Sequence, residues 1–404
     1  MASRHRETAL LCALLSFAVS LPLSFASDAK ALATRKPQAT SNLDVRASAE
    51  TSIYTDDTHV DVVTPTIAGT IADPMKGWSL SGRYLVDVVT AASPDIVATA
   101  SPPWTEVRHA GSLEGSYEKG DVGIGAHASI SREPDYQSIS AGVRGTLSLD
   151  EKNFGLLLGY AYRHDTAGRA GTPFEVFGWT LQRHDVSGGL TVVVNRSTIG
   201  ALQLDAMIER GNQAKPYRYV PLFVLGAAEE VPAGASVELV SALRLHARPL
   251  EALPLRRDRF ALTGRIAHRR PGATLRLEER LYTDTWGMAA STTDARYSID
   301  LGRFVTVWPH LRFHAQTGAD FWQRATETFV DEGGVITIPV IRTGDRELGP
   351  LFTVTGGGGV SVKLGANFSA SLQVDGVFTQ YLDALYLTRR WALFSALALQ
   401  AAFD

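Results

Sequence analysis

Charged and histidine side chains recur at intervals of two or four residues in several parts of this sequence. Successive side chains of a β-strand point to opposite faces, so residues at these intervals share one face. The sets with this spacing are Arg83 with Asp87, Glu106 with Arg108, Arg276 with Glu278 and Arg280, and His310 with Arg312 and His314. Inside a pore they would set an ion preference; alternatively, they pair with one another in a structural network. Acidic and basic residues are mixed in these sets, which favours the paired network.

Two stretches, residues 278–287 and 342–350, hold the densest charges in the sequence. The second stretch either folds inward as a constriction loop or forms a rigid outer loop with paired charges, and we favour the rigid loop slightly. Long loops on rigid scaffolds often carry function, so both stretches supply candidate residues. The full set of candidates for the lumen or its constriction is Arg342, Asp345, Arg346, Glu347, Arg276, Glu278, Arg280, Asp284, His310, Arg312 and His314.

Metal-binding and cofactor chemistry is not indicated by these residues. His310 and His314 are about 13 Å apart along a strand, too far to share one metal ion held at roughly 2 Å from each ligand. Cys12 is the only cysteine, and it lies in the export signal described below, so we expect no disulfide, thiolate-held zinc or covalently bound haem. We therefore expect no metal site and no cofactor.

A tripeptide that contains a His–Asp pair occurs twice, as Arg163-His164-Asp165 and as Arg183-His184-Asp185. With a serine nucleophile, such pairs near a barrel mouth would suit a lipid-modifying hydrolase. The sequence has no Gly-x-Ser-x-Gly nucleophile elbow, and spacing alone does not assemble a triad. We favour solvated strand ends, and we expect no catalytic residues and no enzymatic activity.

The elements that position these residues follow from a strict alternation of apolar and polar residues. It is clearest at residues 122–131, 136–150, 154–162, 186–194 and 368–379. Alternation with a period of two predicts β-strands that have one apolar and one polar face. Strands of roughly ten residues or more are long for a soluble protein and fit tilted strands that span a membrane.

Short turns and long polar stretches separate the expected strands. The turns lie at 118–121, 150–153 and 270–272, and the long stretches lie at 165–175, 211–235, 325–348 and 380–390. Outer-membrane barrels have plain turns at one end and longer loops at the other. The sequence therefore predicts an all-β fold, a closed antiparallel transmembrane barrel of about 16 strands (range 14–18) that occupies residues 46–404.

The N-terminus has the features of a secretory signal peptide. Arg4 and Arg6 precede an apolar stretch over residues 9–25, and small residues lie at Ser24 and Ala26. We predict a cleaved signal peptide at 1–26 and a flexible lead-in at 27–45. No later stretch has the roughly 18 apolar residues of a membrane-spanning helix. Export to the bacterial outer membrane as a closed barrel fits both observations.

Aromatic residues near the ends of the expected strands suggest the girdles that flank the apolar band of an outer-membrane barrel. The residues concerned are Trp78, Tyr84, Tyr160, Tyr162, Trp179, Tyr282, Trp286, Trp308 and Trp391. Ordinary β-propensity explains any one of them equally well.

Five stretches are specific enough to indicate a family. They are residues 54–61 (YTDDTHVD), 84–95, 216–221 (PYRYVP), 281–287 (LYTDTWG) and 342–350 (RTGDRELGP). Together they resemble domain-of-unknown-function family 3570, over nearly the whole chain after the signal peptide. The resemblance implies an exported bacterial protein of the outer-membrane barrel type, and it supplies no activity and no catalytic residue.

These patterns predict a porin, channel or transport scaffold with a charged polar lumen. The expected partners are outer-membrane lipid, small solutes or ions, and a periplasmic or lumen partner protein. Nucleic acid is not among them, because a protein that binds nucleic acid usually has a basic surface, and the formal net charge of this chain is −3. The alternatives are an outer-membrane lipid-modifying hydrolase and a structural barrel that presents its loops to a partner.

Overall fold

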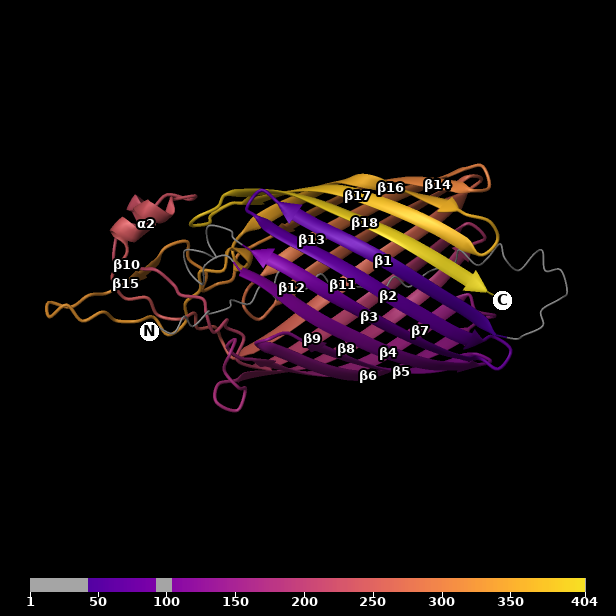
Figure 1. Ribbon diagram of the computed structural model, residues 1–404, viewed down its shortest axis with the longest axis horizontal. Coiled ribbons are helices and arrows are strands. Elements are labelled where there is room, and N and C mark those ends of the chain that lie inside the picture. Colours follow the sequence, from indigo (N-terminus) through magenta and orange to yellow (C-terminus); the bar gives the residue numbers. More distant parts are fainter. Residues whose placement is uncertain (1–42, 92–103, 404) are drawn as a thin grey trace, which may run out of the picture.

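The computed structural model describes residues 43–91 and 104–403 (Figure 1). The predicted signal peptide and residues 27–42 of the predicted lead-in lie outside the described residues, as do Pro94 and Asp95. The strands are β1 (Asp44–Asp56), β2 (Val60–Asp73), β3 (Trp78–Ala91), β4 (Trp104–Lys119), β5 (Val122–Arg132), β6 (Tyr136–Leu149), β7 (Phe154–Ala167), β8 (Trp179–Asn195), β9 (Thr198–Gly211), β10 (Leu222–Val224), β11 (Arg256–Arg270), β12 (Ala273–Asp284), β13 (Ala289–Leu301), β14 (Val305–Gln316), β15 (Thr326–Thr328), β16 (Leu351–Lys363), β17 (Phe368–Tyr381) and β18 (Arg389–Phe403).

Sixteen of these strands form one closed barrel, which confirms the predicted fold class and strand number. Each barrel strand pairs with its neighbours in antiparallel fashion, and β1 closes the ring by pairing with β18. β10 and β15 stand outside the barrel as a parallel pair. Closure leaves no unpaired barrel edge, which is what a sheet inside lipid requires.

The predicted alternation sets the two faces of the barrel wall. Apolar side chains point outward, as the exposed fractions of Leu158 (67%), Leu113 (63%) and Ile124 (62%) show. Their neighbours along each strand point inward and are mostly polar or small, because side chains alternate with a period of two. An apolar outer surface of this extent matches the lipid-facing band of a transmembrane barrel.

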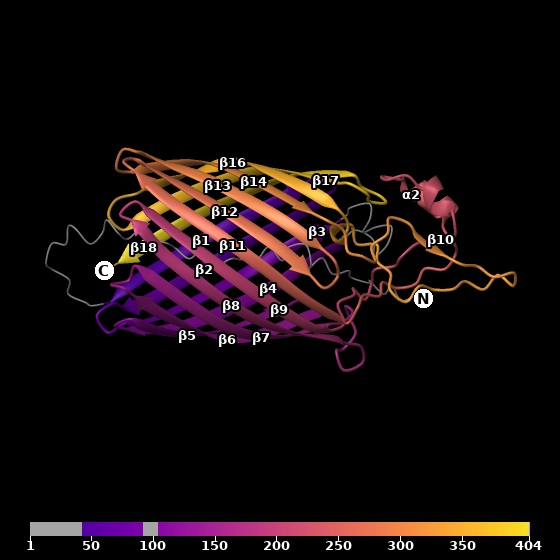
Figure 2. The same ribbon diagram turned by 180° about the vertical axis from the view of Figure 1, so that it is seen from behind.

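The two ends of the barrel differ in their connections (Figures 1 and 2). At one end the strands join through residues 74–77, 120–121, 150–153, 196–197, 271–272, 302–304 and 364–367. The opposite end, here called the loop end, carries the connections 57–59, 133–135, 168–178, 212–255, 285–288, 317–350 and 382–388. The predicted short turns all lie at the first end, and the predicted long stretches all lie at the loop end. This division matches the periplasmic and external ends of outer-membrane barrels.

The two longest loops fold into ordered structure beyond the barrel. Residues 212–255 contain β10, the 3₁₀-helix η2 (Ala227–Glu230) and the helix α2 (Val237–Leu243), and residues 317–350 contain β15 and the 3₁₀-helix η3 (Arg346–Leu348). Both views show β10 and α2 projecting past the barrel (Figures 1 and 2). Within the described part of the chain, every helix is too short or too polar to cross a membrane.

Three tryptophans assigned to the aromatic girdles lie elsewhere. Trp179 and Trp308 have the same parity as inward-facing residues of their strands, and Trp286 is only 4% exposed inside a cluster of loop residues. By contrast, Trp391 is 57% exposed on the outer face, as a girdle residue should be. Position near a strand end was therefore a weaker guide than the parity of the alternation.

The assignment of faces predicts unequal effects of the same substitution at adjacent positions. Replacing Leu158 by arginine should lower the free energy of unfolding in lipid vesicles by about 2 kcal/mol or more, because the charge must enter hydrocarbon. Leu157→Arg is the matched control, since Leu157 follows the inward parity of β7. Denaturant unfolding followed by tryptophan fluorescence measures both variants. Equal losses would contradict the assigned faces.

Candidate functional site

The predicted lumen residues of β12 and β14 share the inward face of the barrel. Arg276, Glu278, Arg280 and Asp284 alternate with Leu275, Leu277, Leu281 and Thr283, and His310, Arg312 and His314 alternate with Leu311 and Phe313. The exposed leucine and phenylalanine side chains mark the outer face, so the charged set points into the lumen.

Ion pairs connect this set to β11, the next strand of the barrel, and to β9 beyond it. Arg280 lies 3.8 Å from Asp205 of β9, and Glu278 lies 2.5 Å from Arg265 of β11. Asp284 is almost fully buried and lies 2.5 Å from Arg257, whose guanidinium also stacks on Trp286. The charges of this part of the lumen therefore form a network along β9, β11 and β12.

The two histidines have different surroundings. Nε2 of His310 is 3.0 Å from Asp294, and Nδ1 is 3.0 Å from Asp375, so the ring bridges β13 and β17 across the inner wall. His314 instead contacts Thr292 at 2.8 Å. The two imidazole rings therefore contact different partners.

The glycine run 356–359 makes room for the inner wall around His310. A Cβ atom on Gly359 would overlap the ring of Trp308, and one on Gly357 would overlap Asp375. β16 can therefore lie close to these large inward side chains only because these positions carry no side chain.

Solvent exposure inside the barrel changes from one end to the other. Inward residues near the short turns, such as Arg83 and Arg276, are exposed. Inward polar residues in the half of each strand nearer the loop end are mostly buried; examples are Asp87, Glu209 and Thr379. The lumen is thus open to water toward the short turns and filled toward the loop end.

A charged contact joins the two longest loops at the loop end. Arg218 lies 2.5 Å from Asp345 and 3.3 Å from Glu251, and Lys215 lies 3.8 Å from Asp345. The side chains of Arg218 and Asp345 are each only 14% exposed, and that of Glu251 is 1% exposed. Thr343 also donates a hydrogen bond to Glu251 over 2.6 Å. The candidate residue Asp345 is therefore held by charges that come from residues 215–218.

The neighbouring candidate Glu347 ties the same loop to the barrel wall. The hydroxyl of Tyr381 at the end of β17 donates to Glu347 over 2.8 Å, and Arg390 of β18 lies 3.6 Å away. The guanidinium of Arg346 stacks over the ring of Tyr381. Arg342 donates to the carbonyl oxygen of its own loop at Pro339.

Tyr217, next to Arg218, connects the loop of these two residues to another part of the barrel wall. The hydroxyl of Tyr217 donates to Asp135 in the β5–β6 turn over 2.9 Å, and it accepts a 2.7 Å hydrogen bond from the backbone of Ala170. β4, β3, β2 and β1 separate this turn from β18 around the ring. Residues 215–218 and 342–350, here called the mouth bridge, therefore cross the loop end from one part of the wall to another.

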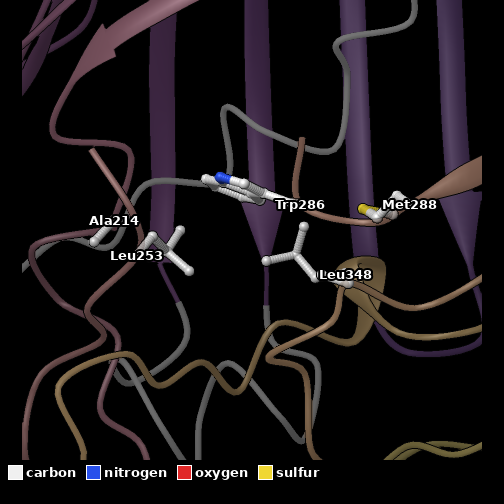
Figure 3. Close-up of a cluster of buried hydrophobic side chains, with 6 residues drawn as sticks. Ala214, Leu253, Trp286, Met288 and Leu348 are labelled. Carbon is white, nitrogen blue, oxygen red and sulfur yellow. The ribbon is translucent and has the colours of Figure 1, made fainter. Parts of the chain in front are cut away.

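An apolar cluster includes Leu348 of the mouth bridge. Trp286 packs with Ala214, Leu253, Met288, Ala319 and Leu348 (Figure 3). These residues come from three different loops, so the cluster holds the loops together. Trp286 and Leu348 belong to two of the stretches that carried the family resemblance, and these stretches meet here.

Burial and charge fix the protonation of the mouth bridge. Burial alone would raise the pKa of the Asp345 carboxyl, but the charges of Arg218 and Lys215 outweigh it and hold the pKa well below its usual range. Burial and the nearby charge of Asp135 raise the pKa of the Tyr217 hydroxyl above its usual range. At neutral pH the bridge thus has an ionised carboxylate at Asp345 and a hydrogen-bond donor at Tyr217.

The two His–Asp pairs of the sequence do not form dyads. His164 and His184 follow the outward parity of β7 and β8, whereas Asp165 and Asp185 follow the inward parity. His184 contacts the hydroxyl of Tyr160 on the outer face at 2.8 Å, and Asp185 pairs with Arg183 inside. Each histidine is thus separated from its aspartate by the barrel wall.

Several members of the site were not predicted from the sequence. Arg218 and Tyr217 lie in the PYRYVP stretch, which contributes to the family resemblance but indicates no role for either residue. Glu251, Arg390 and Asp375 carried no signal that marked them as partners. Their contacts join residues far apart in sequence, and a local pattern does not specify such contacts.

Fold and site together define a transmembrane β-barrel of the outer-membrane type, with a charged lumen and a bridged mouth. The chain belongs to the family described as Protein of unknown function (DUF3570), which matches residues 178–386. The family resemblance found in the sequence is thereby confirmed over these residues, whereas the stretches 54–61 and 84–95 lie outside them. The matched region contains both long loops and the whole mouth bridge. None of the curated proteins matches this sequence.

Similar solved structures are distant in sequence and share the fold alone. The siderophore receptor PirA from Pseudomonas aeruginosa is 13% identical with a TM-score of 0.42, and the match covers 86% of this chain and 57% of that chain. A bacterial polysaccharide outer membrane secretin is 9% identical with a TM-score of 0.45 and coverages of 90% and 98%. CdiB from Acinetobacter baumannii is 10% identical with a TM-score of 0.48 and coverages of 90% and 61%. This chain therefore spans little more than half the length of PirA.

Removing the central cation of the mouth bridge should open the loops. Arg218→Met leaves Asp345 and Glu251 buried without that cation, which costs roughly 3 kcal/mol, or a hundredfold in the opening equilibrium. Limited proteolysis within residues 212–255 measures the opening. The matched control is Arg256→Met, because the Arg256 side chain is 73% exposed. Equal cleavage of wild type and Arg218→Met would contradict the bridge.

The mouth bridge should also resist mild acid. A carboxyl whose pKa is lowered by folding stabilises the folded form above its ordinary pKa of 3.8, and the contribution is lost as the pH falls below that value. Hydrogen-exchange protection factors of residues 342–350 should therefore stay constant between about pH 7 and 5 and fall below about pH 4. Asp345→Asn should lack this acid-dependent step. Loss of protection already between pH 7 and 5 would exclude Asp345 as the responsible group.

Proposed function

We propose that this protein is a gated channel in the bacterial outer membrane that passes small polar or charged solutes. The observation that carries the proposal is the contrast between the two ends of the lumen. Inward arginines near the short turns are exposed, whereas the loop end is crossed by the mouth bridge. A polar interior that is open on one side and bridged on the other suits a path whose opening depends on the loops.

The charges of the inner wall support passage of charged solutes. Arg276 is exposed in the lumen, and its neighbours Glu278 and Arg280 are paired with residues of β11 and β9. An exposed cation beside paired charges gives the path a local preference among ions, without an electrostatic field of one sign along its whole length. These residues would line the path of permeation, with no part in a catalytic step.

The mouth bridge supplies the element that would move. Its central contact is polar and joins two long loops, whereas the barrel strands are held by continuous ladders of hydrogen bonds. Loops of this kind open at a lower free-energy cost than the sheet that carries them. Opening of the bridge would therefore leave the barrel intact.

Planar-bilayer recording tests the gate. The double variant Arg218→Ala, Asp345→Ala should raise the open probability about tenfold or more over wild type, because it removes the central contact of the bridge. Arg210→Ala, Asp258→Ala is the matched control, a charge pair at the loop ends of β9 and β11 that lies outside the bridge. Heat-modifiable gel mobility establishes that each variant is folded.

Two results would overturn the proposal. A folded double variant that shows no conductance would contradict the channel, and the barrel would then serve as a scaffold for a partner. A wild-type protein with the same open probability as the double variant would contradict the gate.

A further inference from the structure

Three carboxylates converge at the loop end, apart from the mouth bridge itself. Glu106 lies at the start of β4, and Glu133 and Asp135 lie in the β5–β6 turn. One oxygen from each lies within 4.8 Å of the others. The exposed fractions are 5% for Glu106, 5% for Glu133 and 0% for Asp135. We call these residues the carboxylate cluster.

The contacts around the carboxylate cluster leave some of its oxygens unsatisfied. Oε1 of Glu106 and Oδ1 of Asp135 are buried and have no hydrogen-bond partner among residues 43–91 and 104–403. Arg108 lies 4.0 Å from Glu133, but its guanidinium also donates to Asp87 over 2.6 Å. Buried polar atoms are rarely left without partners, and an unpartnered acceptor suggests an ion at that place.

We propose that the carboxylate cluster binds one divalent cation of the hard, oxygen-preferring type, and that calcium fits it best. Calcium takes oxygen ligands at about 2.3–2.6 Å, so oxygens around one ion lie up to about 5 Å apart. The cluster offers only oxygen ligands, at separations in that range. Magnesium demands a tighter octahedron with ligands at about 2.0–2.1 Å, and the softer transition metals favour nitrogen or sulfur. This proposal departs from the expectation of no metal site.

The position of the cluster gives the ion a structural role. Asp135 accepts the hydrogen bond from Tyr217, and Tyr217 accepts one from the backbone of Ala170. An ion held by Asp135 would therefore tie β4 and the β5–β6 turn to the long loop 212–255. Removing it would loosen this anchor of the mouth bridge. Binding itself does not depend on permeation, so the site stands apart from the channel proposal.

A shared proton is the competing explanation for the unsatisfied oxygens. Two buried carboxyl groups at this separation can relieve their repulsion by holding one proton between them. The two explanations differ in their response to calcium. A bound ion makes the unfolding temperature depend on calcium concentration, and a shared proton does not.

Calorimetric titration of calcium into the refolded full chain tests the site. The protein is stripped with chelator and kept in detergent free of lipopolysaccharide, so that lipid phosphates do not compete. Wild type should bind one calcium ion per chain, more tightly than magnesium, and its unfolding temperature should rise with calcium. Glu106→Gln should weaken binding about tenfold or more, because the charge and number of the ligands set affinity. Asp135→Asn is the second variant.

Glu114→Gln is the matched control, because Glu114 faces inward on the same strand and pairs with Arg144. It should bind calcium as wild type does. Heat-modifiable mobility establishes that each variant is folded. Absence of binding up to roughly 10 mM calcium in the folded wild type would overturn the proposal, since weak extracellular calcium sites have dissociation constants of about 1 mM or below. Unchanged affinity in both Glu106→Gln and Asp135→Asn would overturn it as well.

Discussion

The requirement that every backbone hydrogen bond be satisfied inside lipid governs the rest of this structure. A sheet meets it only by closing on itself, and here β1 completes the ring with β18. Closure sends alternate side chains into an interior that is shared by all the barrel strands. Many of the charges placed there pair with residues of other strands, as the contacts of Arg265 with Glu278 and of Arg280 with Asp205 show.

The loops at the loop end need other stabilising contacts, because they lie outside the hydrogen-bond ladders of the barrel strands. They are held by a buried polar chain, through Tyr217, Arg218 and Asp345, and by the apolar cluster around Trp286. The polar contacts and the apolar packing hold the same loops together, and the ion pair compensates part of the cost of burying its charges. The apolar cluster in turn packs against Trp179 and Tyr282 of the barrel strands.

Much of the barrel was predictable, because a period of two is a local property of the sequence. The alternation at 136–150 gave both faces of β6, and the parity of His310 and Arg312 placed them in the lumen. Trp308 shares that parity and was misplaced only because its nearness to a strand end was given more weight. The mouth bridge was not predictable in the same way. Arg218 and Asp345 are brought together by the tertiary folding of two separate loops. No regular spacing of residues in the sequence indicates that contact.

The pairing of the first strand with the last also has a consequence for the order of assembly. Val45 lies opposite Phe403, so the seam of the barrel joins the two ends of the described chain. A nascent or partly inserted chain that lacks β18 has two free strand edges, each ready to pair with a foreign strand. The ring can close only after β18 is available, and contacts between residues so distant in sequence form slowly. The cell must therefore shield both edges of this protein until its C-terminal strand arrives.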